Sequence, residues 1–274
     1  MKELINHITA QLATVYPEDE AQALAWWIME EETGLSRSQM LTGCKGTTNF
    51  AHVQEIVERI LHFEPIQYIF GHTLWNGLDL KVTPATLIPR PETAELVEKV
   101  ERLKVKGERL KVLDIGTGSG CIEIALKKAH PEWQVTGIDI SEEAIEVAKE
   151  NAKRNGVEVE FKVADIFHLQ SSISNLQYDI IVSNPPYICE SEKASMRPNV
   201  LNYEPATALF VPDNDPLKFY RRIAELKLGK HLFFEINEAY PDELSAMLSE
   251  LGYTDIQITN DIYGKPRIIE ARMA

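Results

Sequence analysis

Residues 111–120 read Lys-Val-Leu-Asp-Ile-Gly-Thr-Gly-Ser-Gly, and this stretch decides the fold. Its first half, Lys111 to Ile115, is a short apolar run of the kind that forms a buried strand. Its second half holds three glycines, which let the backbone turn sharply and approach a ligand closely. A helix is expected to follow and to end near His130. A strand, a glycine loop and a helix in this order predict the first unit of a parallel α/β sheet.

The sequence on both sides of this stretch continues the alternation of helices and strands. A helix is expected to begin at Pro91, and another at Ser141. Further strands are expected at 134–138, 159–163, 178–183 and 231–236, with helices at 216–228 and 241–251. Two final strands, 253–260 and 266–272, have no helix between them, so we expect an antiparallel pair at the sheet edge. The pattern predicts a doubly wound α/β domain.

The first 70 residues differ from the rest because they contain only helical patterns. Val53, Ile56, Val57 and Ile60 recur at the spacing of one helix face, and shorter repeats precede them. Asn76-Gly77 follows between two short apolar runs, which is a strong β-hairpin pattern. We therefore predict a helical bundle at 1–71, a hairpin linker at 72–88 and the α/β domain at 89–274.

The composition restricts the partners and the compartment. The 274 residues carry a net charge of −14 and have a pI near 5.0, so most of the surface should repel nucleic acid. Three cysteines at long spacings, without a CxxC pair, argue against a disulfide framework or a zinc site and fit a reducing cytoplasm. No metal is expected. The sequence shows neither a signal peptide nor a membrane-spanning segment, so no membrane partner is expected.

The spacing of the glycines bears on the ligand of the loop. The dinucleotide fingerprint GxGxxG requires a third glycine or alanine at position 121, where this chain has Cys121. The GxGxG spacing therefore favours S-adenosylmethionine over NAD. The predicted cofactor-binding residues of this loop are Gly116, Thr117, Gly118, Ser119 and Gly120.

Two acidic residues follow the next two strands. Asp139 ends the strand at 134–138, where a carboxylate can accept hydrogen bonds from both ribose hydroxyls of a bound nucleoside. Asp165 follows the strand at 159–163 and is expected to face the adenine amino group, with Ile166 packed beside the ring.

The fourth strand ends in Asn184-Pro185-Pro186-Tyr187, a position that faces the transferable methyl group in this topology. The Asn184 carboxamide oxygen and the Pro185 carbonyl can each accept one N–H of a planar NH2 group, orienting its nitrogen and stabilising developing positive charge. Prolines fix the backbone here. Tyr187 is expected to lie against the planar substrate. The motif predicts methylation of an amide or aromatic NH2 without a metal.

The chain resembles the HemK-type family, the peptide chain release factor glutamine N5-methyltransferases. The resemblance covers nearly the whole chain and includes residues 64–71, 87–93, 112–122, 183–188, 203–205 and 261–267. It implies a helical substrate domain, a hairpin and a seven-stranded, Rossmann-like class I methyltransferase domain. It also implies that S-adenosylmethionine is bound by Gly116 to Gly120, Asp139, the Asp165–Ile166 region and Asn184. The substrate would be a glutamine of a class I release factor held at Asn184 to Tyr187.

Three other functions share parts of this pattern. A glutamine methyltransferase of a ribosomal protein also carries the Asn-Pro-Pro-Tyr motif, although the Ile-Pro-Arg-Pro-Glu-Thr segment at 88–93 favours the release-factor branch. A DNA adenine-N6 methyltransferase fits the planar NH2, but the −14 charge argues against it. A nucleoside-binding module without catalysis would leave the Asn-Pro-Pro-Tyr motif without a function. The chain departs modestly from the family at 211–216 and at Glu235-Ile236-Asn237.

Overall fold

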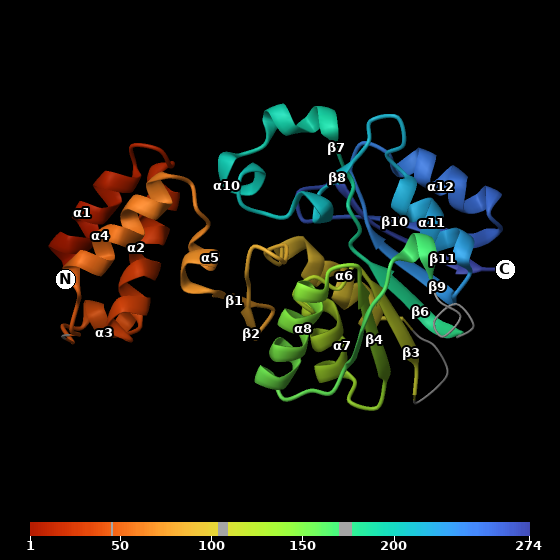
Figure 1. Ribbon diagram of the computed structural model, residues 1–274, viewed down its shortest axis with the longest axis horizontal. Coiled ribbons are helices and arrows are strands. Elements are labelled where there is room, and N and C mark those ends of the chain that lie inside the picture. Colours follow the sequence, from red (N-terminus) through yellow and green to blue (C-terminus); the bar gives the residue numbers. More distant parts are fainter. Residues whose placement is uncertain (45, 104–108, 170–176) are drawn as a thin grey trace. The chain divides into compact units, whose positions relative to one another are not determined.

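The computed structural model describes residues 1–44, 46–103, 109–169 and 177–274. The chain forms two compact units (Figure 1). The smaller comprises Met1–Phe70 and Pro198–Tyr203, and the larger comprises Gly71–Arg197 and Glu204–Ala274. Within the described residues, no helix is both long and apolar enough to cross a membrane.

The smaller unit is entirely helical. It contains α1 (Lys2–Leu12), α2 (Glu18–Thr33), α3 (Arg37–Leu41), α4 (Phe50–Leu61), α5 (Ile66–Phe70) and the short α10 (Pro198–Leu201). The apolar face predicted at 53–60 is buried in the core of this bundle, where it meets residues of α1 and α2. Asn49 caps α4 by accepting hydrogen bonds from two backbone N–H groups, which explains why that helix begins there.

The larger unit is built on a seven-stranded sheet in the order β10-β11-β9-β6-β3-β4-β5. The strands are β3 (Lys111–Ile115), β4 (Gln134–Asp139), β5 (Glu160–Val163), β6 (Tyr178–Ser183), β9 (Gly229–Glu235), β10 (Tyr253–Asn260) and β11 (Pro266–Met273). The first five are parallel, and β11 runs antiparallel to both β9 and β10. The predicted α/β class and the antiparallel pair at the edge are confirmed.

Helices cover the sheet on both faces (Figure 1). They are α6 (Pro91–Glu101), α7 (Cys121–Ala129), α8 (Glu142–Arg154), α11 (Lys218–Leu226) and α12 (Pro241–Glu250). Apolar residues of α6 and α7 form one core with β3 and β6, whereas those of α11 and α12 form a second core with β9 and β11. The central strands are therefore buried on both sides, which explains their nearly continuous apolar sequences.

The predicted hairpin consists of β1 (His72–Trp75) and β2 (Leu78–Lys81), and it belongs to the larger unit. Asn151 of α8 attaches it there. Its side chain accepts from Lys81 N at 2.6 Å and donates to Lys81 O at 2.9 Å and to Ser119 O at 2.8 Å. One buried amide thus joins the hairpin, α8 and the glycine loop. The sequence predicted a separate linker at 72–88, whereas the structure makes the hairpin part of the larger unit.

The segment after the Asn-Pro-Pro-Tyr motif has short elements that the sequence patterns did not predict. These are β7 (Ile188–Cys189), paired with β8 (Phe210–Val211), and the 3-10 turns η2 (Glu190–Ser195) and η3 (Ala206–Ala208). Another such turn, η1 (Ile166–His168), follows β5. Residues 198–203, between these elements, belong to the helical unit. The sequence predicted that this unit contains only residues from the first part of the chain.

We expect Asn151→Ala to lower the free energy of unfolding by about 2–4 kcal/mol, because it leaves three backbone groups without their side-chain partner. Urea denaturation followed by circular dichroism measures this. Asn155→Ala is the matched control, since Asn155 caps the end of the same helix and its two bonds, to Asp79 O and Asn151 O, are exposed and partly buried. The control should cost less than about 1 kcal/mol. Equal losses would show that Asn151 holds no special position.

Candidate active site

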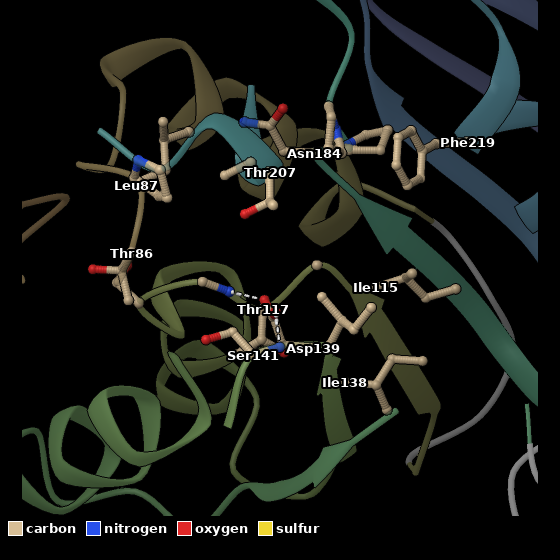
Figure 2. A pocket seen from close by; sticks show the side chains of 18 of the residues that line it. Thr86, Leu87, Ile115, Thr117, Ile138, Asp139, Ser141, Asn184, Thr207 and Phe219 are labelled. Carbon is tan, nitrogen blue, oxygen red and sulfur yellow. Dashed lines mark hydrogen bonds between the residues drawn. The ribbon is translucent and has the colours of Figure 1, made fainter. Parts of the chain in front are cut away.

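A pocket of about 410 Å³ lies at the carboxyl ends of the parallel strands. Ile115 of β3, Ile138 of β4 and Asn184 after β6 all contribute to its wall. Figure 2 shows Asn184 and Thr207 across the pocket from Asp139, the last residue of β4. Ligands of open α/β sheets bind at this edge, so the pocket has the expected location for a cofactor site.

The glycine loop between β3 and α7 forms the floor of the pocket. Gly116, Gly118 and Gly120 have φ angles of 89°, 53° and 80°. Residues with a Cβ rarely adopt such positive φ angles. The N–H groups of Gly116 and Thr117 both donate to Ile138 O, at 2.9 and 3.1 Å. The loop is thereby fixed to the end of β4, and its glycines leave room for a ligand to approach the backbone.

The glycine loop lies directly beside the Asn-Pro-Pro-Tyr motif. A Cβ built on Gly116 would lie 3.9 Å from the carbonyl oxygen of Asn184. The Ser183 hydroxyl donates to Ile115 O, which joins the ends of β6 and β3. The two motifs, 68 residues apart in sequence, are therefore parts of one site.

Asp139 has its carboxylate fixed by two backbone groups. Gly118 N donates to Oδ2 at 2.8 Å and Ser141 N donates to Oδ1 at 2.9 Å. Burial raises the pKa of Asp139, while the bonds from Ser141 and Gly118 act in the opposite direction. Each carboxylate oxygen has a second lone-pair position, so Asp139 retains acceptor capacity toward the pocket that it lines.

Asp165 and Ile166 also line the pocket, on its β5 side. Asp165 caps η1 by accepting from Phe167 N at 2.8 Å, and its other oxygen lies 2.8 Å from Nδ1 of His168. The bond to His168 is the main reason why the pKa of Asp165 is lowered. Ile166 is buried and offers an apolar surface to a planar ring. Both residues line the pocket, and their contact with an adenine ring stays a prediction.

The amide group of Asn184 has a defined partner. Its Nδ2 donates to Thr93 Oγ1 at 3.2 Å, and Thr93 lies in the first turn of α6. Pro185 and Pro186 line the pocket next to Asn184. These residues stand where the sequence predicted a site for a planar NH2 group.

Two predicted site residues, Gly120 and Tyr187, lie outside the pocket lining. Gly120 faces α8, where an added Cβ would come within 3.0 Å of Ala148 Cβ, so this glycine serves helix packing. The Tyr187 hydroxyl donates to Glu235 Oε1 at 3.1 Å, and its ring packs against the core on the α11 side. Burial raises the pKa of Tyr187. The sequence predicted that this ring lies against the substrate, whereas the structure directs it into the core.

Two buried carboxylates, Glu235 and Glu204, were not predicted as site residues. Glu235 at the end of β9 is buried, and its Oε2 accepts from the Thr93 hydroxyl at 2.7 Å. Burial raises the pKa of Glu235, against the effect of the hydroxyls of Thr93 and Tyr187. A carboxylate that ends a buried strand next to the motif strand was the available indication. The pairing of β9 with β6 makes that indication specific.

A second unpredicted carboxylate, Glu204, holds the segment at 87–90 over the pocket. Its Oε2 accepts from Ile88 N at 3.1 Å and its Oε1 from the Arg90 guanidinium at 2.6 Å, while its own side chain is 1% exposed. Trp75 Nε1 donates to Arg90 O at 2.7 Å. Leu87 and Arg90 line the pocket beside Pro205. Two family motifs distant in sequence are thus joined in one wall.

The geometry agrees with comparisons to known proteins. Residues 3–71 match the family model "PrmC N-terminal domain", and residues 106–226 match "Methyltransferase domain". A release factor glutamine methyltransferase of Bacteroides thetaiotaomicron is 42% identical, covering 99% of both chains. One of Flavobacterium psychrophilum is 40% identical over 98% of both.

A solved structure supports the fold alone. The hMettl16 catalytic domain, in complex with a MAT2A 3'UTR hairpin, aligns with a TM-score of 0.59 at 18% identity, covering 97% of this chain and 92% of that one. The identity and coverage of the curated relatives carry the assignment further: the chain belongs to the family of release factor glutamine methyltransferases.

Proposed function

We propose that the chain transfers a methyl group from S-adenosylmethionine to the side-chain amide nitrogen, N5, of a glutamine in a class I peptide chain release factor. One observation carries this proposal. The Asn184–Pro185 turn and the glycine loop line a single pocket, with Asn184 O placed 3.9 Å from where a Cβ of Gly116 would lie. A cofactor bound on the loop would therefore present its reactive group to the motif. The relatives named above supply the substrate class.

The residues of the pocket fit the proposed cofactor. Asp139 offers acceptor positions for ribose hydroxyls at the end of β4, and the backbone of Gly116 and Gly118 is open to a ligand. Ile138 and Ile166 both line the pocket and provide apolar surface for an adenine ring. When bound, the cofactor supplies an electrophilic methyl group on a positively charged sulfur. We propose Thr117, Ser119, Asp165 and Asn184 as further contacts of the cofactor.

The proposed chemistry requires the chain to orient a poor nucleophile. The lone pair of an amide nitrogen is delocalised, so the nitrogen attacks only when it is held in line with the methyl group. The Asn184 carboxamide oxygen and the Pro185 carbonyl each accept one N–H of the glutamine amide, and Pro186 fixes the backbone that carries them. As the new N–C bond forms and the C–S bond breaks, these two acceptors stabilise positive charge on nitrogen. The proton then leaves to solvent.

Selection of a release factor needs more contact than one glutamine side chain offers. We propose that the helical unit provides it by charge. Residues 1–70 and 198–203, which form this unit, contain 4 Lys and Arg against 10 Asp and Glu, a poor surface for phosphate but a suitable one for a basic, RNA-associated protein. On this proposal the enzyme binds protein and makes no direct contact with nucleic acid. It works in the cytoplasm, where translation takes place.

Asp139→Ala should weaken the binding of S-adenosylhomocysteine by at least about tenfold, because two hydroxyl contacts and the bond that orders Gly118 are lost. Isothermal titration calorimetry measures the affinity. Glu142→Ala serves as the control, since this exposed carboxylate lies close by in the first turn of α8. An affinity equal to that of the unsubstituted chain would remove Asp139 from the cofactor site.

Asn184→Ala should reduce the single-turnover rate far more than it reduces cofactor affinity. Loss of one preorganised hydrogen-bonding group at a developing charge typically costs about 2.7–4 kcal/mol of barrier, or 10²–10³ in rate. Single-turnover transfer of a labelled methyl group to a purified release factor measures this. A rate that falls less than about tenfold would contradict the proposed NH2 clamp.

Reversal of charge on the helical unit should slow methylation of the release factor without changing cofactor affinity. Glu18→Lys with Asp19→Lys, in the first turn of α2, is expected to lower kcat/KM by about tenfold, with the largest effect at low salt. The matched control is Asp242→Lys with Glu243→Lys, because these two acidic residues lie in the first turn of α12 in the larger unit. Equal losses for both pairs would mean that net charge, rather than the helical unit, steers the encounter.

A further inference from the structure

A chain of three hydrogen bonds leads from the pocket wall, at Asn184 and Thr93, into the core of the larger unit. Asn184 Nδ2 lies 3.2 Å from Thr93 Oγ1, and Thr93 Oγ1 lies 2.7 Å from Glu235 Oε2. The other oxygen of that carboxylate, Oε1, lies 3.1 Å from the Tyr187 hydroxyl. The four residues come from α6, the end of β9 and the turn after β6, so only the folded sheet brings them together.

When Glu235 is ionised, donor counting fixes the direction of every bond in this chain. An ionised carboxylate only accepts, so Glu235 takes the single hydroxyl proton of Thr93 and that of Tyr187. The Thr93 oxygen then has only lone pairs left for Asn184. The carboxamide must therefore turn its NH2 toward Thr93, which directs its oxygen away from Thr93. The two ends of a carboxamide have nearly the same shape, so packing alone does not select between these orientations.

We propose, on the basis of the proposed role of Asn184 in holding a glutamine amide, that Thr93 and Glu235 are positioning residues that make the pocket specific for an NH2 group. They hold the Asn184 oxygen toward the substrate, where it accepts an N–H of glutamine and repels the carboxylate of glutamate. If the carboxamide turned over, its NH2 would face the substrate, and the preference would move toward glutamate. The choice between amide and acid is thus set by Thr93 in the pocket wall and by Glu235 behind it.

The location of Glu235 supports this role over a purely structural one. Its side chain is buried, and burial of a carboxylate costs stability unless it is compensated. Compensation comes from the Thr93 and Tyr187 hydroxyls and from the positive charge of Arg267, while Glu92 acts against it. The Tyr220 hydroxyl donates to the backbone oxygen of Glu235 at 3.0 Å and fixes its main chain. An apolar residue at this position would avoid the cost but would leave Thr93 free to donate to Asn184.

The test compares Thr93→Val, which removes the hydroxyl at nearly constant volume, with Thr93→Ser, which keeps it. The substrate is a purified class I release factor, and the competitor is the same protein with glutamate in place of the methylated glutamine. Thr93→Val should lower kcat by about tenfold or more, as loss of outer-shell partners does elsewhere, with S-adenosylhomocysteine affinity changed less than about twofold. Thr93→Ser should lose less than about threefold. Thr136→Val controls for loss of a buried hydroxyl that does not line the pocket.

The competitor provides a readout that a structural role would not change. Relative to the unsubstituted chain, Thr93→Val should bind the glutamate form at least about threefold more tightly, because the Asn184 NH2 can then turn to it. Glu235→Gln is the second variant, with the same expected direction, and serves if Thr93→Val does not fold. Equal rates for the valine and serine variants, or an unchanged preference for glutamine over glutamate, would overturn the inference. Failure of the unsubstituted chain to methylate any release factor would instead refute the proposed function.

Discussion

The pairing of β3 with β6 is the constraint on which the site depends. Their register sets Val112 against Ile180 and Asp114 against Val182, so both strands end at the same edge of the sheet. The bond from the Ser183 hydroxyl to Ile115 O joins these ends. The glycine loop and the Asn-Pro-Pro-Tyr turn therefore leave the sheet side by side. A slip of the register by one residue would turn every side chain of β6 to the opposite face.

The same edge holds carboxylates that a purely stabilising core would avoid. Glu204 and Glu235 are buried, but each has hydrogen-bond partners that hold a wall of the pocket. Asp114 of β3 and Glu123 of α7 are also buried, and within the described residues their side-chain oxygens have no hydrogen-bond partner. Burial raises the pKa of both, that of Glu123 to about 7, so the folded chain binds protons there that the unfolded chain releases. Their contribution to the free energy of unfolding is therefore greatest at low pH, and it is lost as the pH rises through their raised pKa values in the folded chain.

The elements around the pocket divide the work of positioning. Backbone groups of the glycine loop are fixed by Ile138 and Asp139, and Asn151 ties the loop to α8 and the hairpin. The opposite wall depends on side chains, in which Glu204 joins the 87–90 segment and Glu235 orients Thr93. Backbone fixation suits a cofactor that is bound in every cycle. Side-chain networks suit discrimination between substrates, because a single proton position decides which group is accepted.

The sequence by itself determined the fold class and the order of the strands along the chain, and it predicted ligand-binding residues at the strand ends. The periodicity of apolar residues, the spacing of glycines and the position of prolines act on the local backbone. They can therefore be recognised in the sequence without knowledge of the fold. The sequence indicated Asn184, Asp139 and the glycine loop for this reason. Only the tertiary structure decided that Tyr187 turns to Glu235, that Thr93 stands behind Asn184, and that 198–203 returns to the helical unit. These contacts join residues far apart in the chain, and the choice of partner for a buried polar group follows from three-dimensional proximity, which no local pattern records.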